Sequence, residues 1–471
     1  MIGRGIGIPF RHGTGGETSI PPEIKKNIIA WYDPKKQGMT NYDVIEAYAE
    51  DFTKWAYRNW RGTVKITNNT IVITNVVKTN NIVEDYKKPY SDLTIRVTGV
   101  TENKHLIVRQ GRGKPETRIK KDGVYTFKDN NLYFGFGVSV IGECNITITQ
   151  LPTSILKDFS DNKHDAYLYG FKGKLNSGVG IYAQDFKNWN YGSTINNNIS
   201  TKSYNKFHIV KKKADNWFDF TIGIQKANYY NKPYKLKFNI NKKIDDIKFN
   251  IVSTDGNSIT TAAYSVYIND GSIIDVPIIS EEIFNNKEET NIYYDFGTNK
   301  DIEIDIELIA DYPNQLCYDG RSYAVVYNMP ILTDYTVMAK RTWFEKEEYS
   351  AFISNSLGGM EEPSNGAFSV ELKSLNSFTT ISFGSITSIG IPEKRITYQT
   401  KQSYNGNSIN VGTKESNDIL ILGGRYFIKN DNAAGNTWTG CHGAIIVADR
   451  SFTKEEINWL KRNWDKIRYE K

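Results

Sequence analysis

The chain has 471 residues, 39% hydrophobic and 24% charged, which suits several globular domains and excludes intrinsic disorder. Its 59 basic and 53 acidic residues leave a net charge of only +6, spread along the chain, which argues against a nucleic-acid-binding protein. The three cysteines lie far apart, which excludes a disulfide framework and a paired-cysteine metal motif.

Residues 1–20 form a glycine-rich segment without hydrophobic periodicity. Two interpretations are open: a disordered tail, or an anchoring arm that becomes ordered against a partner. Glycine lets a backbone pass close to neighbouring chains, so we predict attachment through this arm. Because the segment is too short and too glycine-rich for a signal peptide, we expect synthesis in a cytoplasm. The candidate anchoring residues are Gly3, Arg4, Gly5, Gly7, Pro9, Phe10 and Arg11.

Two short helices are predicted, one near each end of the chain. The proline pair that ends at Pro22 suits a first helical turn, and the apolar spacing extends that helix through Ile28 and Trp31. Near the other end, Thr453 and Glu456 form a capping-box pattern ahead of an apolar stripe. We expect this second helix to pack on a sheet.

Between the helices the chain is dominated by alternating patterns that are typical of β-strands. Residues 58–153 and 201–313 carry similar signals in the same order, each block ending on a long alternating strand. We therefore predict two related β-sandwich modules. The other shared signals are Lys-Pro-Tyr at 88–90 and 232–234 and Asp-Gly at 122–123 and 270–271.

The remaining segments resemble the concanavalin-like jelly roll of the laminin-G/lectin superfamily. The resemblance implies one discontinuous jelly roll built from residues 21–57, 154–200 and 314–471, with both modules inserted into its loops. The predicted fold is all-β: a concanavalin-like jelly roll, two inserted β-sandwich modules, and short N- and C-terminal helices. The matching segments are DILILGGR (418–425), WTGCHGAIIVADRSFTKEEINWL (438–460), DFSDNKHDAYLYG (158–170), YDGRSYAVV (318–326) and YTVMAKRTWF (335–344).

The MIGRGIG start, the segment AWYDPKKQG (30–38) and this jelly roll together resemble virion surface proteins of tailed phages of Bacteroidetes, including the crAss-like group. That resemblance implies a head-fibre, capsid-decoration or tail-fibre protein at the virion surface, made in the host cytoplasm. The arm would bind other virion proteins, and the modules would contact a host-surface glycan. A homo-oligomer is expected. A glycan-binding adhesin of a bacterial cell is a second possibility.

Glu303, Asp305 and Glu307 are predicted to project from one face of a strand. Such carboxylates suit a retaining glycosidase, and the string resembles the catalytic strand of concanavalin-fold β-glucanases, with Glu303 as nucleophile and Glu307 as acid/base. The alternative is the solvent face of a strand whose isoleucines face the core. We favour this alternative, and no enzymatic activity, because the strand closes an inserted module and no tryptophan lies between Trp217 and Trp343.

Two further candidate sites remain. Asp158, Asp161 and Asp165 form a weak candidate calcium site, with a plain Asx-rich turn as the alternative. Trp438, in a polar stretch, and Tyr426 are candidates for an exposed aromatic surface that stacks on a sugar. No cofactor is expected because no phosphate-binding glycine loop occurs, and no apolar run is long enough for membrane insertion.

Overall fold

The computed structural model describes residues 18–39, 45–57, 61–77, 80–85, 92–111, 115–128, 134–172, 186–191, 199–203, 205–211, 221–225, 229, 233–240, 247–254, 259–280, 291–297, 301–344, 347–357, 366–392, 394–428 and 433–468. Strands make up most of the secondary structure in these ranges, and the helices are short, so the predicted all-β fold is confirmed. None of the described helices is long and apolar enough to cross a membrane.

The jelly roll consists of two packed sheets. One sheet has the order β13 (Ile155–Leu156), β14 (Ala166–Tyr169), β26 (Tyr323–Tyr327), β35 (Ile419–Leu422), β28 (Ile353–Ser356), β29 (Gly366–Lys373), β30 (Phe378–Ser382) and β31 (Ser385–Ser388). The other has the order β2 (Ile28–Tyr32), β38 (Thr439–Ala448), β27 (Thr336–Trp343), β32 (Ile396–Thr400), β33 (Ser403–Tyr404) and β34 (Asn407–Ser408), with β25 (Leu316–Asp319) also paired to β38. Ala30, Leu168 and Phe352, which are distant in sequence, share one core between these sheets.

Two more β-sandwiches, which we name module 1 and module 2, each have their own core. Module 1 pairs the sheet β10 (Gly123–Phe127), β7 (Leu93–Thr98), β12 (Gly142–Gln150), β5 (Thr70–Val76), β4 (Thr63–Ile66) with the sheet β3 (Ala56–Tyr57), β6 (Asn80–Asp85), β11 (Phe134–Ser139), β8 (His105–Gln110), β9 (Glu116–Ile119). Module 2 pairs the sheet β22 (Ile273–Val276), β19 (Tyr234–Ile240), β24 (Ile302–Ile309), β17 (Lys206–Lys211), β16 (Ile199–Lys202) with the sheet β15 (Asn190–Tyr191), β18 (Thr221–Gln225), β23 (Asn291–Gly297), β20 (Ile247–Thr254), β21 (Ile259–Ile268).

The two modules have the same topology, because their strand orders match position by position. A matched turn contact supports the correspondence. Asp122 Oδ1 accepts a hydrogen bond from the Val100 amide at 3.0 Å in module 1. Asp270 Oδ1 accepts the equivalent bond from the Ile240 amide at 2.8 Å in module 2. In both modules, therefore, the aspartate of the repeated Asp-Gly pair accepts a hydrogen bond from a backbone amide near the end of a neighbouring strand.

The modules begin earlier in the chain than predicted. Phe52 and Trp55 are buried in the core of module 1, although the prediction begins that module at residue 58. Phe186 and Trp189 are buried in the core of module 2, which was predicted to begin at residue 201. The predicted boundaries are therefore too late, because these aromatic side chains belong to the cores of the two sandwiches.

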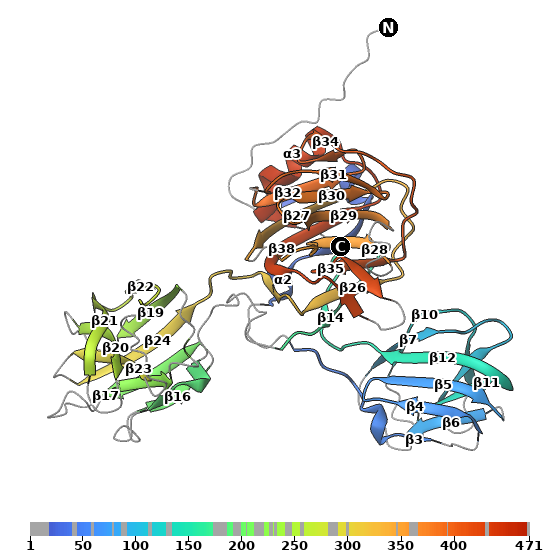
Figure 1. Ribbon diagram of the computed structural model, residues 1–471, viewed down its shortest axis with the longest axis horizontal. Coiled ribbons are helices and arrows are strands. Elements are labelled where there is room, and N and C mark those ends of the chain that lie inside the picture. Colours follow the sequence, from blue (N-terminus) through green and yellow to red (C-terminus); the bar gives the residue numbers. More distant parts are fainter. Residues whose placement is uncertain are drawn as a thin grey trace, which may run out of the picture.

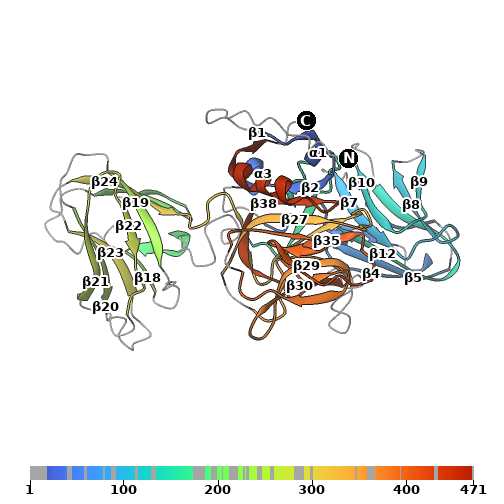
Figure 2. The same ribbon diagram turned by 90° about the horizontal axis from the view of Figure 1, so that it is seen from above.

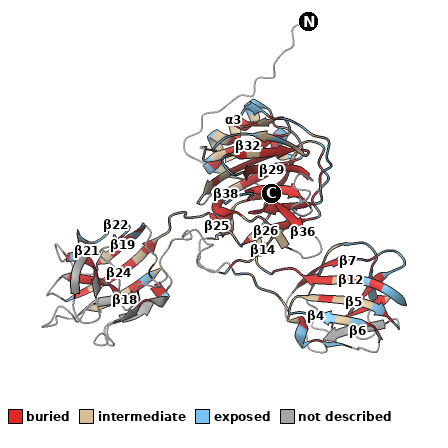
Figure 3. Ribbon diagram, viewed as in Figure 1, coloured by how far each residue is buried: buried red, intermediate tan, exposed pale blue. Residues whose placement is uncertain are grey.

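The two modules are placed differently relative to the jelly roll. Module 2 stands apart from it, joined by connecting chain, in both views (Figures 1 and 2). Module 1 contacts the jelly roll through Arg96, whose guanidinium lies over the rings of Tyr327 and Phe427. Buried residues line the inner faces of the sheets in each lobe (Figure 3). Each lobe therefore has its own hydrophobic core.

The N-terminal helix is shorter than predicted. Helix α1 (Pro22–Lys25) has only four residues, and Ile28 already belongs to strand β2. The predicted continuation of the helix through Trp31 is wrong, because Trp31 pairs with Ile446 in strand β38. Sheet pairing with a distant strand thus overrides a local helical spacing.

The C-terminal helix is confirmed. Helix α3 (Lys454–Asn463) begins at a capping box formed by Thr453 and Glu456. Its buried Leu460 packs with Met338 and Ile446 on the outer face of the sheet that contains β2 and β38. The helix therefore covers a sheet face, as the apolar stripe predicts.

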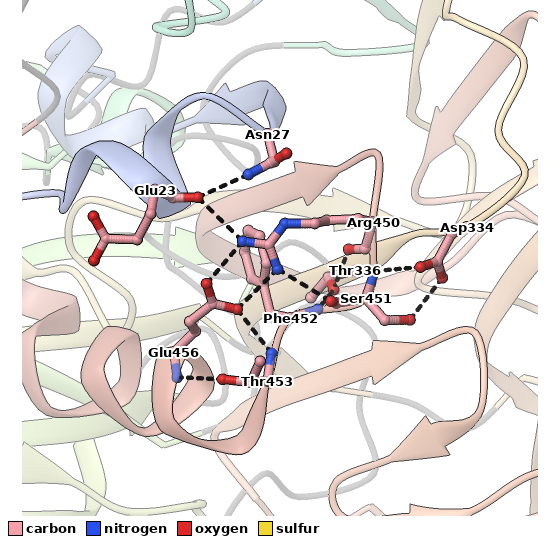
Figure 4. Close-up of polar contacts among 9 residues, drawn as sticks. All are labelled: Glu23, Asn27, Asp334, Thr336, Arg450, Ser451, Phe452, Thr453 and Glu456. Carbon is pink, nitrogen blue, oxygen red and sulfur yellow. Dashed lines mark hydrogen bonds and ion pairs between the residues drawn. The ribbon is translucent and has the colours of Figure 1, made fainter. Parts of the chain in front are cut away.

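A terminal latch, defined here as Glu23, Asn27, Arg450 and Glu456, joins the two ends of the chain (Figure 4). The Arg450 guanidinium donates to both carboxylate oxygens of Glu456, at 2.7 and 2.9 Å, and to the Glu23 carbonyl at 3.1 Å. The Asn27 side chain donates to the same carbonyl at 2.8 Å. The N-terminal helix is therefore held directly against the start of α3.

We expect the terminal latch to weaken in acid. The hydrogen bond from Arg450 lowers the pKa of Glu456. A carboxyl whose pKa is lowered by folding stabilises the fold above its unfolded pKa, and this contribution is lost as pH falls through the folded pKa. Glu456→Gln is therefore expected to cost about 1 kcal/mol at neutral pH. Chemical unfolding across a pH series measures this cost.

The difference between Glu456→Gln and the wild type should disappear in acid. Glu455→Gln is a matched control, because Glu455 is exposed in the same helical turn. A difference that stays constant from neutral to acid pH would show that the carboxylate charge has no part in the latch.

Candidate functional site

The predicted carboxylate strand is β24, and its side chains alternate as expected. Ile302, Ile304, Ile306 and Leu308 are buried in the core of module 2. Glu303, Asp305 and Glu307 therefore share the opposite face, which is partly open to solvent. The alternation matches the prediction.

Basic side chains of strand β17 contact two of these carboxylates. His208 Nδ1 and Asp305 Oδ1 are 2.9 Å apart, and His208 Nε2 lies 3.4 Å from Glu303 Oε1. Lys206 Nζ lies 3.7 Å from Asp305 Oδ2. On the other side, Lys237 of β19 is the register partner of Glu307. These cross-strand contacts favour a solvent-facing ladder of opposite charges.

Trp438 and Tyr426 do not form an exposed surface, and this prediction is wrong. Trp438 is fully buried in the jelly-roll core, where its ring packs 5.0 Å from Phe352 and 5.4 Å from Tyr318, between ring centroids. Tyr426 is 5% exposed, and its ring lies so close to Gly435 that a Cβ there would be 2.2 Å from it. Neither ring presents a face on which a sugar can stack.

The aspartates of the candidate calcium site are used in a turn. Asp158 Oδ1 accepts hydrogen bonds from the amides of Trp31 and Ser160, both at 2.8 Å. Asp158 Oδ2 accepts from the Ser160 hydroxyl at 2.7 Å and from the His164 amide at 2.8 Å. Asp165 accepts from the Asp158 amide at 2.9 Å. This network favours the Asx-turn alternative, since donors already occupy both Asp158 oxygens.

No group of three or more metal-ligating side chains is found among the described residues, Asp158, Asp161 and Asp165 included. The candidate anchoring residues Gly3, Arg4, Gly5, Gly7, Pro9, Phe10 and Arg11 lie outside the described residues. The root of the arm is described. Strand β1 (Thr18–Ser19) pairs in parallel with β39 (Ile467–Arg468), and Ile20 is buried beside α3. The arm therefore starts from a fixed point on the jelly roll.

A cleft of about 420 Å³ lies where module 1 meets the jelly roll, and we name it the junction cleft. Strands β7, β10 and β12 of module 1 supply one wall, and the ends of β26 and β35 supply the other. The polar side chains on the module 1 wall are those of Arg96, Thr98, Asp122, Asn145 and Thr147. Those of the jelly roll are Tyr327, Asn328 and Asp418.

Arg96 fixes the two walls of the junction cleft together. Its guanidinium carbon lies 5.5 Å from the ring centroids of both Tyr327 and Phe427. All three residues are buried. The Tyr327 hydroxyl is also 3.0 Å from the hydroxyl of Tyr169 on β14. A desolvated cation–π contact of this kind contributes about 2 kcal/mol, so the walls are held in place before any ligand arrives.

Sequence reasoning missed the junction cleft because its walls come from distant parts of the chain. Thr98 and Asn145 belong to an inserted module, whereas Asp418 belongs to the C-terminal part of the jelly roll. The one local signal is Arg96, an arginine in the otherwise polar and uncharged row Thr94, Arg96, Thr98 of strand β7. A single charged residue in such a row indicates that its side chain makes a specific contact, but the sequence does not show which residues it contacts.

Comparisons with known proteins give only weak likenesses. No family model matches the sequence, and no curated protein matches it. The N-terminal CBM22-1-CBM22-2 tandem domain of Xyn10C from Paenibacillus barcinonensis is 11% identical, over 57% of this chain and 97% of that chain, with a TM-score of 0.22. A sialidase of Trypanosoma rangeli is 10% identical, over 86% of this chain and 84% of that chain, with a TM-score of 0.20. AerE of Microcystis aeruginosa is 13% identical, over 52% and 90% of the two chains, with a TM-score of 0.14. Scores this low establish no common fold, and no conclusion about this chain depends on them.

Proposed function

We propose that the protein is a structural component of a phage virion surface, attached by its N-terminal arm, with its β modules displayed for adhesion to a glycan. The observation that supports the proposal is that the root of the arm and the modules lie at different ends of the jelly roll. The root of the arm lies beside α3, because Ile20 packs in the same cluster as Leu460. In Figure 1, α3 lies at the end of the jelly roll opposite β14, near which the modules connect.

This placement suits display. An arm bound to the particle would direct the modules away from it, since they leave the jelly roll at its other end. The resemblance of the MIGRGIG start and of the AWYDPKKQG segment to phage virion proteins supports the virion setting. The terminal latch supports the role of the arm, because it holds the segment that follows the arm firmly against the jelly roll, as an anchoring arm requires.

Mass spectrometry of gradient-purified particles from an infected culture tests the proposal. We compare the full chain with a form that lacks residues 1–17. The truncation stops before Thr18, so the β1–β39 pairing and the buried Ile20 are kept. The full chain should be found in particles and the truncated chain should be lost from them, while both have the same melting temperature. Absence of both forms from particles would contradict the virion proposal.

The proposed function includes no hydrolytic step. The contacts of Glu303 and Asp305 with His208 support a structural role for the carboxylate strand. We expect the wild-type protein to release no reducing sugar from β-glucan, and Glu303→Gln to be indistinguishable from it. Cleavage by the wild type that Glu303→Gln abolishes would instead establish a glycoside hydrolase.

A further inference from the structure

We propose that the junction cleft binds a neutral saccharide. The inference depends on the proposed glycan-contact function and assigns that contact to one place in the molecule. Clefts between domains are common ligand sites, and about 420 Å³ falls within the usual volume range of small-molecule pockets. What singles out a saccharide is the chemistry of the lining.

The lining offers many hydrogen-bonding groups on a small apolar base. Thr98, Asn145 and Thr147 project from adjacent strands of module 1. Asn328 and Asp418 face them from the jelly roll, and Val124 of β10, which is half-buried, supplies apolar surface. Hydroxyl and amide groups donate to and accept from sugar hydroxyls, the carboxylates accept from them, and a Val side chain suits the apolar ring carbons.

The charges of the lining favour a neutral ligand over an anionic one. The cleft contains two exposed carboxylates, Asp122 and Asp418, and one guanidinium, that of Arg96. The Arg96 charge is buried against the rings of Tyr327 and Phe427. An acidic sugar would therefore meet the two carboxylates first, and like charges repel. Sialic and uronic acids should be excluded.

Module 2 has a face equivalent to the module 1 wall of the cleft, formed by β24 and its neighbours, but the jelly roll does not form a cleft with it among the described residues. In the matching topology, Lys237 pairs with Glu307 as Arg96 pairs with Thr149. By the same register, Glu303 stands where module 1 has Asn145. The described part of the module 2 face carries charges of both signs and is partly exposed, whereas the module 1 face is largely uncharged and contacts the jelly roll. Glu303 is therefore a matched control position for Asn145.

The experiment measures binding of the full-length protein to an array of neutral oligosaccharides from glucan, xylan, mannan and galactan, together with sialylated and uronic-acid oligosaccharides. Titration calorimetry on the best neutral ligand follows. Asn145→Ala and Asp418→Ala should each weaken binding about tenfold, the loss expected for one hydrogen bond with a charged or well-aligned partner. Glu303→Ala should bind like the wild type. Melting temperatures confirm that each variant is folded.

The outcomes separate this inference from the proposed function. Saccharide binding that survives both cleft substitutions, or that prefers acidic sugars, would overturn the inference and leave the glycan-contact function standing. Binding of no saccharide by the wild type would overturn both the inference and the glycan part of the proposed function. The particle measurement decides the virion setting independently of either result.

Discussion

Glu371→Gln is expected to destabilise the jelly roll by about 3–5 kcal/mol, because it leaves a buried arginine without its counter-charge. Glu371 is fully buried on β29, and Arg341 on β27 is 4% exposed. The Arg341 Nε and Nη2 atoms donate to the two carboxylate oxygens at 2.5 and 2.6 Å. The pair bridges the two sheets of the sandwich, so its loss acts on the whole lobe.

Two further donors complete the coordination of Glu371. Trp343 Nε1 donates to one oxygen and the Tyr404 hydroxyl to the other, both at 2.9 Å. Glu371 itself has a φ of 57°, a left-handed conformation that costs a non-glycine residue about 1 kcal/mol or more. The hydrogen-bond network compensates for this strain, which is a second reason to expect a large effect from the substitution.

Hydrogen exchange of β27 and β29, combined with urea unfolding, measures how much stability the jelly roll loses in Glu371→Gln. Glu303→Gln is the control, since it removes a partly exposed carboxylate and should cost less than about 1 kcal/mol. The double variant Arg341→Met with Glu371→Leu should recover most of the lost stability. Unchanged protection of both strands in Glu371→Gln would contradict the prediction.

Trp438→Ala is expected to cost about 3–5 kcal/mol, the range for removing a large aromatic side chain from a core. The Trp438 ring packs against Phe352 and Tyr318, and its centroid lies 5.6 Å from that of Trp343. A Cβ placed at Gly440 would lie 2.2 Å from the Trp438 ring, so the neighbouring backbone is also fitted to it. Thermal unfolding measures the loss.

The same variant separates a structural from a binding role for Trp438. At a temperature where the variant remains folded, we expect its saccharide affinity to equal that of the wild type. Trp438→Phe keeps part of the volume and should lose less stability than Trp438→Ala. Loss of saccharide binding without loss of stability would restore the aromatic-surface hypothesis for this residue.

The sequence predicted correctly those strands and helices whose pattern is set by residues close together in the chain. The alternation of Ile302, Ile304 and Ile306 is visible in the sequence because one face of β24 is apolar and the other is polar. The capping box of α3 is equally local, since Thr453 and Glu456 are three residues apart. Both features depend only on residues that are near each other in the chain, so they can be recognised from a single sequence.

Features that depend on distant partners were missed. Trp438 lies in a polar stretch, so its neighbours in sequence suggested exposure, whereas its neighbours in space are aromatic. The starts of the modules were also missed, although a repeated Asp-Phe-x-x-Trp-x-Tyr at 51–57 and 185–191 marks them in the sequence. The junction cleft has no such marker, because neither wall alone indicates that the other lies opposite.

The insertion of both modules into the jelly roll has a consequence for how the protein is made. The sheets of each module close within one continuous stretch of chain, so each module can fold while synthesis continues. Strand β2 cannot, because its partner β38 lies near the other end of the chain. All five residues of β2 are buried in the finished protein, and they stay exposed until β38 has left the ribosome. The modules therefore mature first, and the newly made N-terminal strand needs protection from aggregation until the last tenth of the chain arrives.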